Sequence, residues 1–508
     1  MTLYDNRDST LSGAYWQYIS SITFVFVGGI FYIFLIHFYN IQIVGVFSLL
    51  SAIIYLFSTV FSLGLQQGVQ HFISFHLGRG DDEVVRSYIK KFIPVAFGLS
   101  FLAFAALWLL SPLLGFLFFH TNSYIEYLRL IDIELLFVII NSILLAMLLG
   151  LQNFRLNGLL NVLNLAVGYG LIIPFIIMNS DPIRIIYAWI TGYFLTTIFS
   201  FYYVQRRMRS PKMQKSAGVR MIPVLSYSFP IFISGLISYG AAYVDRFIVS
   251  YLLNLSELGV YNFALLIVNA MSILTGPFGV ILLSRLSAFY GKNDMENFKL
   301  YSLKSTEVII AIYVPLALIV AALSPSILLF LANSNYTLGS LPIMIILISS
   351  TFTISTNIFS VTLQAIRKTR LFIISSSVAL LVNFILSVLL IPRYGINGAA
   401  VGFASTGVGT FFVILYFARK YGTFVIEYEK ILKIYASGFG VFFLMLAVQE
   451  RLGYSILKLF IFIATGIAVY LFLIRVTEAF SEEDINLFLN MMPGNFVRLK
   501  RFFKSLFV

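Results

Sequence analysis

Residues 43–66 read IVGVFSLLSAIIYLFSTVFSLGLQ, an apolar run that contains no Asp, Glu, Lys or Arg. A helix of about 20 such residues crosses the hydrocarbon core of a bilayer. The run lacks the residue-by-residue alternation of a membrane barrel strand, so it predicts a helix. Comparable stretches, 14 in all, lie at residues 15–38, 43–66, 92–111, 130–150, 157–178, 185–204, 226–250, 258–283, 305–323, 341–363, 371–391, 396–418, 431–449 and 453–474. The sequence therefore predicts an all-α polytopic membrane protein with 14 transmembrane helices.

The composition of the whole chain indicates the same class. Of its 508 residues, 60% are hydrophobic and only 11% are charged, whereas an ordinary soluble domain has about 25% charged residues. The absence of cysteine excludes disulfides, thiolate-bound metals and cysteine nucleophiles. The sequence also lacks the phosphate-binding loop motif of ATP-hydrolysing proteins. We therefore expect a protein that is not an enzyme and has no cofactor or metal site.

The distribution of Lys and Arg predicts the orientation, because cytoplasmic loops carry the excess of these residues. With the N-terminus inside, 28 of the 34 Lys and Arg residues fall in cytoplasmic segments, five fall in outer segments, and Arg246 lies within a span. This predicts a multi-pass protein of the cytoplasmic (cell) membrane with both termini in the cytoplasm. It also accounts for the net charge of +13 without a nucleic-acid partner.

The chain contains an internal repeat. Residues 40–47 (NIQIVGVF) match 254–261 (NLSELGVY), residues 78–81 (GRGD) match 291–294 (GKND), and residues 151–155 (LQNFR) match 363–367 (LQAIR). Each copy holds an even number of spans, six, so both copies enter the membrane in the same orientation. We therefore predict a six-helix lobe at 1–210, a second at 211–425 and two additional helices at 426–475. A basic amphipathic tail on the membrane surface is predicted at 476–508.

Several motifs occur in a characteristic order along this 6+6+2 plan. Asp245-Arg246-Phe247-Ile248 lies in the seventh span, Gly259-Val260-Tyr261 enters the eighth, and IPRYGINGAA at 391–400 precedes the twelfth. With these motifs the chain resembles the polysaccharide flippase branch of the MOP (multidrug/oligosaccharidyl-lipid/polysaccharide) exporter superfamily. The resemblance covers essentially the whole chain.

The resemblance implies a function in polysaccharide biosynthesis. It implies that two lobes alternate in access and move a lipid-linked oligosaccharide, of polyprenyl- or dolichyl-phosphate type, from the cytoplasmic to the outer leaflet. The partners expected are this substrate and membrane lipids, and we expect a monomer.

Candidate substrate-binding residues are the scarce charges in or near the spans. A charge at the bilayer centre costs roughly 3 kcal/mol on insertion scales, so Arg246 indicates either a phosphate- or sugar-binding group or a structural pair. Asp245 is its neighbour but points elsewhere on the helix. His71 and Arg285, equivalent in the repeat, lie near cytoplasmic ends of spans and indicate either an inner mouth for the substrate phosphate or interfacial anchors.

Asp132 and Glu134 are candidate ion-coupling residues at the outer end of the fourth span. The alternative is a solvated first turn of the helix, where acids are common. An Asp-x-Glu pair is also found in membrane-embedded glycosyltransferases.

Two other functions therefore stay open at this point. One is a cation-coupled multidrug or metabolite antiporter of the same superfamily, against which the first span lacks an acid. The other is a membrane glycosyltransferase, against which the parallel repeat argues.

Overall fold

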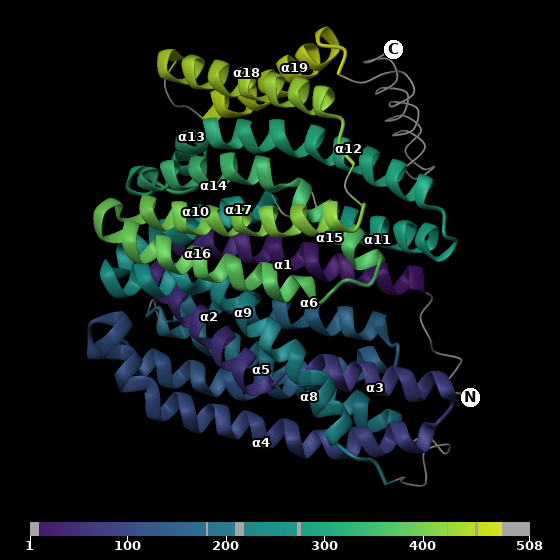
Figure 1. Ribbon diagram of the computed structural model, residues 1–508. Helices are drawn as coiled ribbons and strands as arrows, with labels where there is room; N and C mark the ends of the chain where they lie inside the picture. Colours follow the sequence, from purple (N-terminus) through teal and green to yellow (C-terminus); the bar gives the residue numbers. More distant parts are fainter. Residues whose placement is uncertain are drawn as a thin grey trace. The chain divides into compact units, whose positions relative to one another are not determined.

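The computed structural model describes residues 10–178, 181–208, 218–271, 276–423, 425–452 and 456–479 (Figure 1). Within these ranges every regular element is a helix. The chain divides into two compact units, Met1–Asn262 and Phe263–Val508. Most of the predicted tail at 476–508 and part of the predicted boundary between lobes fall outside the described residues, so both stay predictions.

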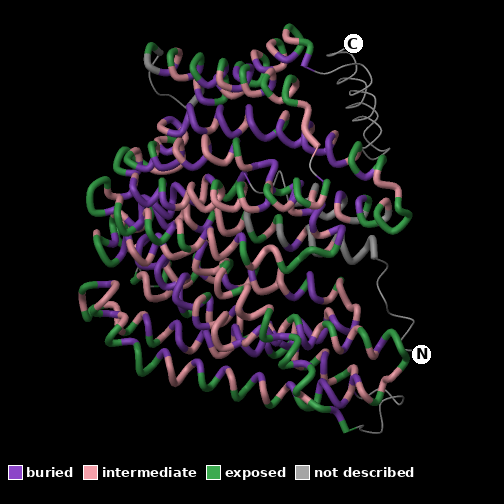
Figure 2. Tube along the Cα trace, in the orientation of Figure 1, coloured by how far each residue is buried: buried purple, intermediate pink, exposed green. Residues whose placement is uncertain are grey.

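The first unit is built around helices α2 and α5. Its α-helices are α1 (Thr10–Phe38), α2 (Ile41–Ser62), α3 (Leu65–Arg79), α4 (Asp82–Leu114), α5 (Ile125–Gly150), α6 (Phe154–Gly170), α7 (Ile172–Met178), α8 (Ile183–Met208), α9 (Ile222–Leu252) and the start of α10 (Leu255–Ala270). The short turns η2 (Gly115–Phe119) and η3 (Asn122–Tyr124) join α4 to α5. The apolar stretches of α2 and α5 are 67% buried, whereas that of α4 is 22% buried. Figure 2 shows the matching contrast between a mostly buried α5 and an α4 that alternates between buried and exposed residues.

The second unit is built around α12. Its helices are α11 (Gly276–Gly291), α12 (Met295–Ala322), α13 (Ser324–Leu331), the turn η6 (Ser334–Gly339), α14 (Ser340–Thr353), α15 (Ser355–Ala365), α16 (Leu371–Tyr394), α17 (Ile396–Lys420), α18 (Tyr428–Leu452) and α19 (Ile456–Val476). The apolar stretch of α12 is 72% buried, and α14 and α18 pack against it.

The described helices agree with the predicted spans. Twelve of them are long and apolar enough to cross a membrane, and each overlaps one predicted span. The remaining two predicted spans fall on α1 and on α10 with α11, where the described apolar stretches, Ile22–Phe38 and Leu255–Ala270, are shorter. The polytopic all-α class is confirmed, and the number 14 stays a prediction.

The matched positions of the repeat have matching local geometry. Asn40 accepts a hydrogen bond from the Ile43 N–H at 3.0 Å, and its counterpart Asn254 accepts one from the Glu257 N–H at 2.9 Å. A side-chain oxygen that satisfies a free amide at the start of a helix stabilises that start. The repeated asparagine thus caps the N-terminus of the following helix in both copies.

A second matched pair ends a helix in the same way. Gly80 and Asn293 both have a left-handed backbone, with φ of 80° and 57°. The residue after each donates its N–H to a carbonyl five residues earlier, that of His76 or Phe289, at 3.0 Å. This is the Schellman ending common at helix C-termini. The repeat of whole lobes stays a prediction, although these local features agree with it.

The motif at 391–400 forms the tight turn between α16 and α17. Gly395 has φ of 56° and ψ of −136°, a conformation that side chains disfavour. A Cβ added to Gly398 would lie 2.5 Å from the Leu390 carbonyl carbon. The two glycines therefore allow α16 to reverse directly into α17 with their backbones in close contact.

Candidate functional site

Helix α9 carries Tyr239, Tyr243 and Arg246 on one face, because they are spaced i, i+4 and i+7. The rings of Tyr239 and Tyr243 stack with centroids 4.6 Å apart. The guanidinium carbon of Arg246 lies 4.2 Å from the centroid of the Tyr243 ring, a cation–π contact. Arg246 is only 9% exposed, and its Nε has no hydrogen-bond partner among the described residues. The arginine in the seventh span is thus buried against an aromatic face and not turned toward lipid.

Asp245 has a different partner from its neighbour Arg246. It is completely buried, and Tyr261 of α10 donates its hydroxyl to Asp245 Oδ2 at 2.5 Å. Asp245 Oδ1 has no hydrogen-bond partner in the part of the chain that the structure describes. The two charges therefore stabilise each other through space while each contacts its own tyrosine.

Six tyrosines form what we call the tyrosine cluster: Tyr32 (α1), Tyr55 (α2), Tyr169 (α6), Tyr193 (α8), and Tyr239 and Tyr243 (α9). Each lies within electrostatic range of other members. Every member keeps part of its surface accessible, and Tyr55 is 42% exposed. Within a membrane-spanning bundle, partly accessible tyrosine side chains form a wall that a polar solute can contact. Arg246 lies within electrostatic range of Tyr32 and Tyr239, so it contributes a cation to this wall.

Glu134 lies at the same cluster, whereas Asp132 does not. Glu134 is 4% exposed and lies within electrostatic range of Tyr55, Tyr169 and Tyr193. Asp132 is completely buried but lies two residues earlier on α5, about 200° around the helix. Neither Asp132 oxygen has a hydrogen-bond partner among the described residues, and Glu134 Oε2 has none there either.

The interpretation of these acids as a solvated first turn is wrong. Helix α5 begins at Ile125, earlier than the predicted residue 130, which places both acids beyond the first turn and inside the bundle. The structure therefore brings Asp245, Arg246 and Glu134 into one region of the first unit.

His71 belongs to another part of the first unit, and Arg285 belongs to the second unit. His71 is exposed on α3, and its ring stacks on Tyr227 of α9 with centroids 4.5 Å apart. Arg285 is exposed on α11 of the second unit. Their shared role at an inner mouth stays a prediction.

The repeated glycines Gly45 and Gly259 let helices α2 and α10 cross closely. A Cβ added to Gly45 would overlap the carbonyl oxygen of Leu255, and one added to Gly259 would overlap that of Ile41. Both contacts lie in the first unit, on the side of Asn40 and Asn254. The matched Gly-Val dipeptide of the repeat is therefore a packing contact between α2 and α10.

The tyrosine cluster is not among the sites predicted from the sequence. A signal was available in the i, i+4, i+7 spacing of Tyr239, Tyr243 and Arg246, which predicts a shared face on α9. The other members lie on four different helices, and no local pattern joins them.

Comparison with known proteins agrees with this architecture. Residues 17–339 match a family described as polysaccharide biosynthesis protein. No curated protein matches the sequence. Among solved structures, the chain is similar to the lipid II flippase MurJ in an inward-closed conformation, with a TM-score of 0.70 and 17% identity over 92% of this chain and 98% of that one.

Two other similar structures are transporters. An inward-facing multidrug resistance MATE family transporter of the MOP superfamily has a TM-score of 0.66 and 16% identity, over 79% of this chain and 94% of that one. A MOP superfamily transporter from Pyrococcus furiosus has a TM-score of 0.54 and 14% identity, over 80% and 92%. These proteins are flippases and transporters rather than enzymes, and at such identities the likeness shows the fold of the MOP superfamily.

Proposed function

The chain belongs to the polysaccharide biosynthesis protein family and has the fold of MOP superfamily transporters, and we propose that it is a flippase for a lipid-linked oligosaccharide. Its two lobes, 1–210 and 211–425, alternate in access and move the head group from the cytoplasmic to the outer leaflet. The observation that carries the proposal is Arg246, buried at an accessible wall of tyrosines inside a membrane-spanning bundle.

The chemistry of the substrate matches this wall. The head group of a lipid-linked sugar carries phosphate and many hydroxyls, and removing them from water without partners costs several kcal/mol per group. Tyrosine hydroxyls donate and accept hydrogen bonds, and aromatic faces pack against the apolar faces of sugar rings. Arg246 supplies the planar donors that suit phosphate oxygens. The lipid tail, in contrast, stays in the hydrocarbon and needs no polar path.

Each candidate residue then has a role. Arg246 binds the phosphate-bearing head group, and Asp245 positions α9 through its hydrogen bond from Tyr261. His71 and Arg285 attract the substrate at the cytoplasmic side. Glu134 is the coupling acid, because it is buried at other members of the same tyrosine cluster that Arg246 contacts. One of its oxygens has no hydrogen-bond partner among the described residues.

The test is a leaflet-accessibility assay on purified protein in liposomes, with a fluorescent lipid-linked oligosaccharide. Arg246→Gln should lose translocation, and Arg246→Lys should retain a part of it because the charge remains. The matched control is Arg393→Gln, which removes an exposed arginine from the end of α16. Native rates in a correctly folded Arg246→Gln protein would refute the assigned site.

Proton coupling is tested in the same liposomes. With a pH gradient imposed, translocation by the native protein should accelerate. Glu134→Gln should abolish this acceleration, while translocation without a gradient should stay measurable. Asp132→Asn is the control, because it changes a buried acid of the same helix outside the tyrosine cluster. A gradient response that survives in Glu134→Gln would show that the coupling acid lies elsewhere.

A cation-coupled antiporter is the second candidate, favoured by Glu134 beside aromatic rings that suit organic cations. Arg246 in the same region disfavours it, because two cations would then share one site. Efflux of fluorescent organic cations that depends on Glu134, together with no movement of lipid-linked sugars, would favour the antiporter.

A further inference from the structure

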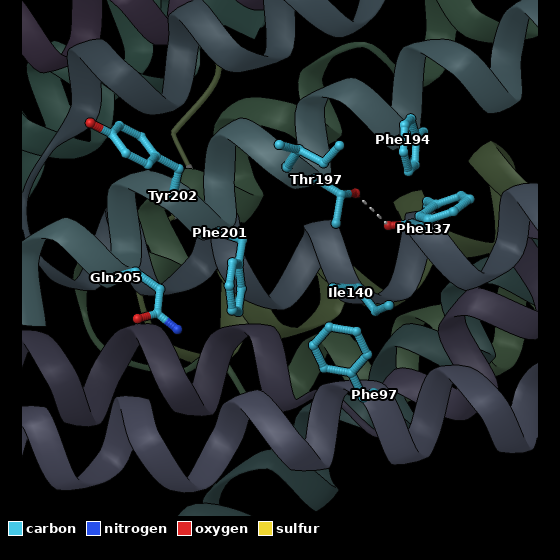
Figure 3. Close-up of a pocket in the computed structure, with 9 residues that line it drawn as sticks. Phe97, Phe137, Ile140, Phe194, Thr197, Phe201, Tyr202 and Gln205 are labelled. Carbon is cyan, nitrogen blue, oxygen red and sulfur yellow. Dashed lines mark hydrogen bonds between the residues drawn. The ribbon is translucent and has the colours of Figure 1, made fainter.

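A groove lies on α4, α5 and α8 of the first unit, and none of its lining residues belongs to the tyrosine cluster. Its volume is about 540 Å³, and its lining residues are Phe97, Phe137, Ile140, Phe194, Thr197, Ile198, Phe201, Tyr202 and Gln205. Helix α5 packs against both α4 and α8, so α5 forms the floor and the other two form the walls. Figure 3 shows the rings of Phe97 and Phe201 around Ile140, with Phe137 and Phe194 beyond them.

The groove is polar at one end only. Gln205 and Tyr202 lie at the opposite end from Phe137 and Phe194 in Figure 3. Thr197 donates its hydroxyl to the backbone carbonyl of Phe137 at 3.4 Å, so this hydroxyl is already satisfied and leaves the middle apolar. The polarity gradient matches an amphipathic ligand whose chain lies along the groove.

Basic side chains stand at the polar end. Arg206 follows Gln205 and shares a helix face with Tyr202 at i+4, and Lys90 lies seven residues before Phe97 on the same face of α4. Both Lys90 and Arg206 are exposed. The counts of Lys and Arg place this end at the cytoplasmic side, where anionic lipids attract basic residues.

The length of the groove corresponds to one leaflet. Phe194 and Gln205 are eleven residues apart on α8, about 16 Å at the helical rise, and the hydrocarbon core of a bilayer is about 30 Å thick. A ligand chain that fills the groove therefore ends near the bilayer midplane. This matches an acyl chain, whereas a longer isoprenoid tail would have to leave the groove.

We propose that this groove is a binding site for an anionic phospholipid of the cytoplasmic leaflet. One acyl chain lies over Phe137 and Ile140 between the walls, and the phosphate lies between Lys90 and Arg206. The site is separate from the proposed substrate site, so it is tested without transport.

The experiment uses the full chain in nanodiscs doped with phosphatidylglycerol that carries a photoactivatable group on its acyl chain. Cross-links should map to peptides of α4, α5 and α8. Ile198→Trp fills the groove from a half-exposed position and should lose most of this labelling. Phe199→Trp is the matched control, because Phe199 is equally exposed on α8 but does not line the groove.

The head-group preference is tested with charge variants. Each basic residue near an anionic surface contributes on the order of fivefold in affinity, so Lys90→Gln with Arg206→Gln should weaken phosphatidylglycerol binding about 25-fold. Lys292→Gln with Lys299→Gln removes two exposed charges from the second unit and should have no effect. Three results would each overturn the proposal. The two tryptophan variants could be labelled equally, or the native protein could bind phosphatidylcholine as well as phosphatidylglycerol. The third is that only a polyprenyl phosphate displaces the photoactivatable lipid.

Discussion

Replacing Glu307 by Ala should destabilise the second unit while leaving the first unit unchanged. Glu307 lies in α12 and is 1% exposed as a side chain. Lys304 Nζ lies 3.1 Å from Glu307 Oε2, and Lys430 Nζ of α18 lies 3.9 Å from the same oxygen. Glu427 completes the charge cluster, 3.6 Å from Lys304 and 2.7 Å from Lys430. The cluster therefore joins α12 to α18.

The magnitude follows from how buried each partner is. Removing one partner of a buried ion pair costs about 3–5 kcal/mol. Here both lysines keep Glu427, which is 40% exposed and therefore partly screened by solvent. We expect a loss of about 2 kcal/mol for Glu307→Ala, below the range for buried pairs because the lysines keep a partner. With an unfolding entropy of about 2.1 cal/mol/K per residue over 263–508, this lowers the melting temperature of the second unit by roughly 4 °C.

The assay must separate the two units. All three tryptophans, at positions 16, 108 and 189, belong to the first unit, so tryptophan fluorescence reports on that unit and should not change. Hydrogen exchange of peptides from α12 and α18, followed on heating, reports on the second. Glu429→Ala is the control, since Glu429 forms an exposed pair with Lys433 at 2.8 Å; its melting should be unchanged. Equal melting of Glu307→Ala and the native protein would refute the reasoning.

Three further predictions concern other contacts. Gly45→Val should destabilise the first unit by more than the 1–3 kcal/mol typical of overpacking, because its Cβ would overlap the Leu255 carbonyl. Gly28→Ala, with nothing within 4 Å of the added Cβ, should be neutral or stabilising. Thermal unfolding followed by tryptophan fluorescence compares the two variants, and equal melting temperatures would contradict the close crossing of α2 and α10. Tyr261→Phe removes the side-chain hydroxyl that hydrogen-bonds to Asp245 and should cost about 1–3 kcal/mol. The same substitution should cost much less in an Asp245→Asn background, and a double-mutant cycle without coupling would exclude the contact. Asn297 donates its side-chain amide and its backbone N–H to Asp294, which lowers the pKa of that carboxyl. The amides in the first turn of α12 should therefore be protected from hydrogen exchange above the ordinary pKa of Asp, and this protection should be lost as the pH falls through the lowered pKa. Asp294→Asn should abolish the pH dependence, and a dependence that persists in this variant would assign it to another group.

The transmembrane helices could be predicted from sequence because hydropathy is a local property. Each run of about 20 apolar residues must be helical in lipid whatever its neighbours are. The helix breaks were harder to predict. Helix α2 ends at Ser62 and α3 begins at Leu65 after two left-handed residues, Leu63 and Gly64, inside an apolar stretch that hydropathy treats as continuous.

The partners of buried charges could not be predicted where they are distant in sequence. Lys430 of α18 forms an ion pair with Glu307 of α12. Hydropathy placed Glu307 in the predicted span 305–323 but gave no indication of this partner. In contrast, the contact of Arg246 with Tyr243 lies within one helix face and follows from spacing alone. Local periodicity therefore predicts same-helix partners, and partners on other helices depend on packing.

The two groups of buried charge differ in a way that separates transport from stability. Glu307 is held between two lysines, so its charge is neutralised within the protein, and its loss should act on melting. Arg246 has one adjacent carboxylate, an Nε without a hydrogen-bond partner among the described residues, and partly accessible tyrosine side chains beside it. A buried cation with spare donor capacity beside an accessible wall can bind an anion without breaking an existing bond. Substitutions at Arg246 should therefore reduce translocation more than they lower the melting temperature, and substitutions at Glu307 should do the reverse.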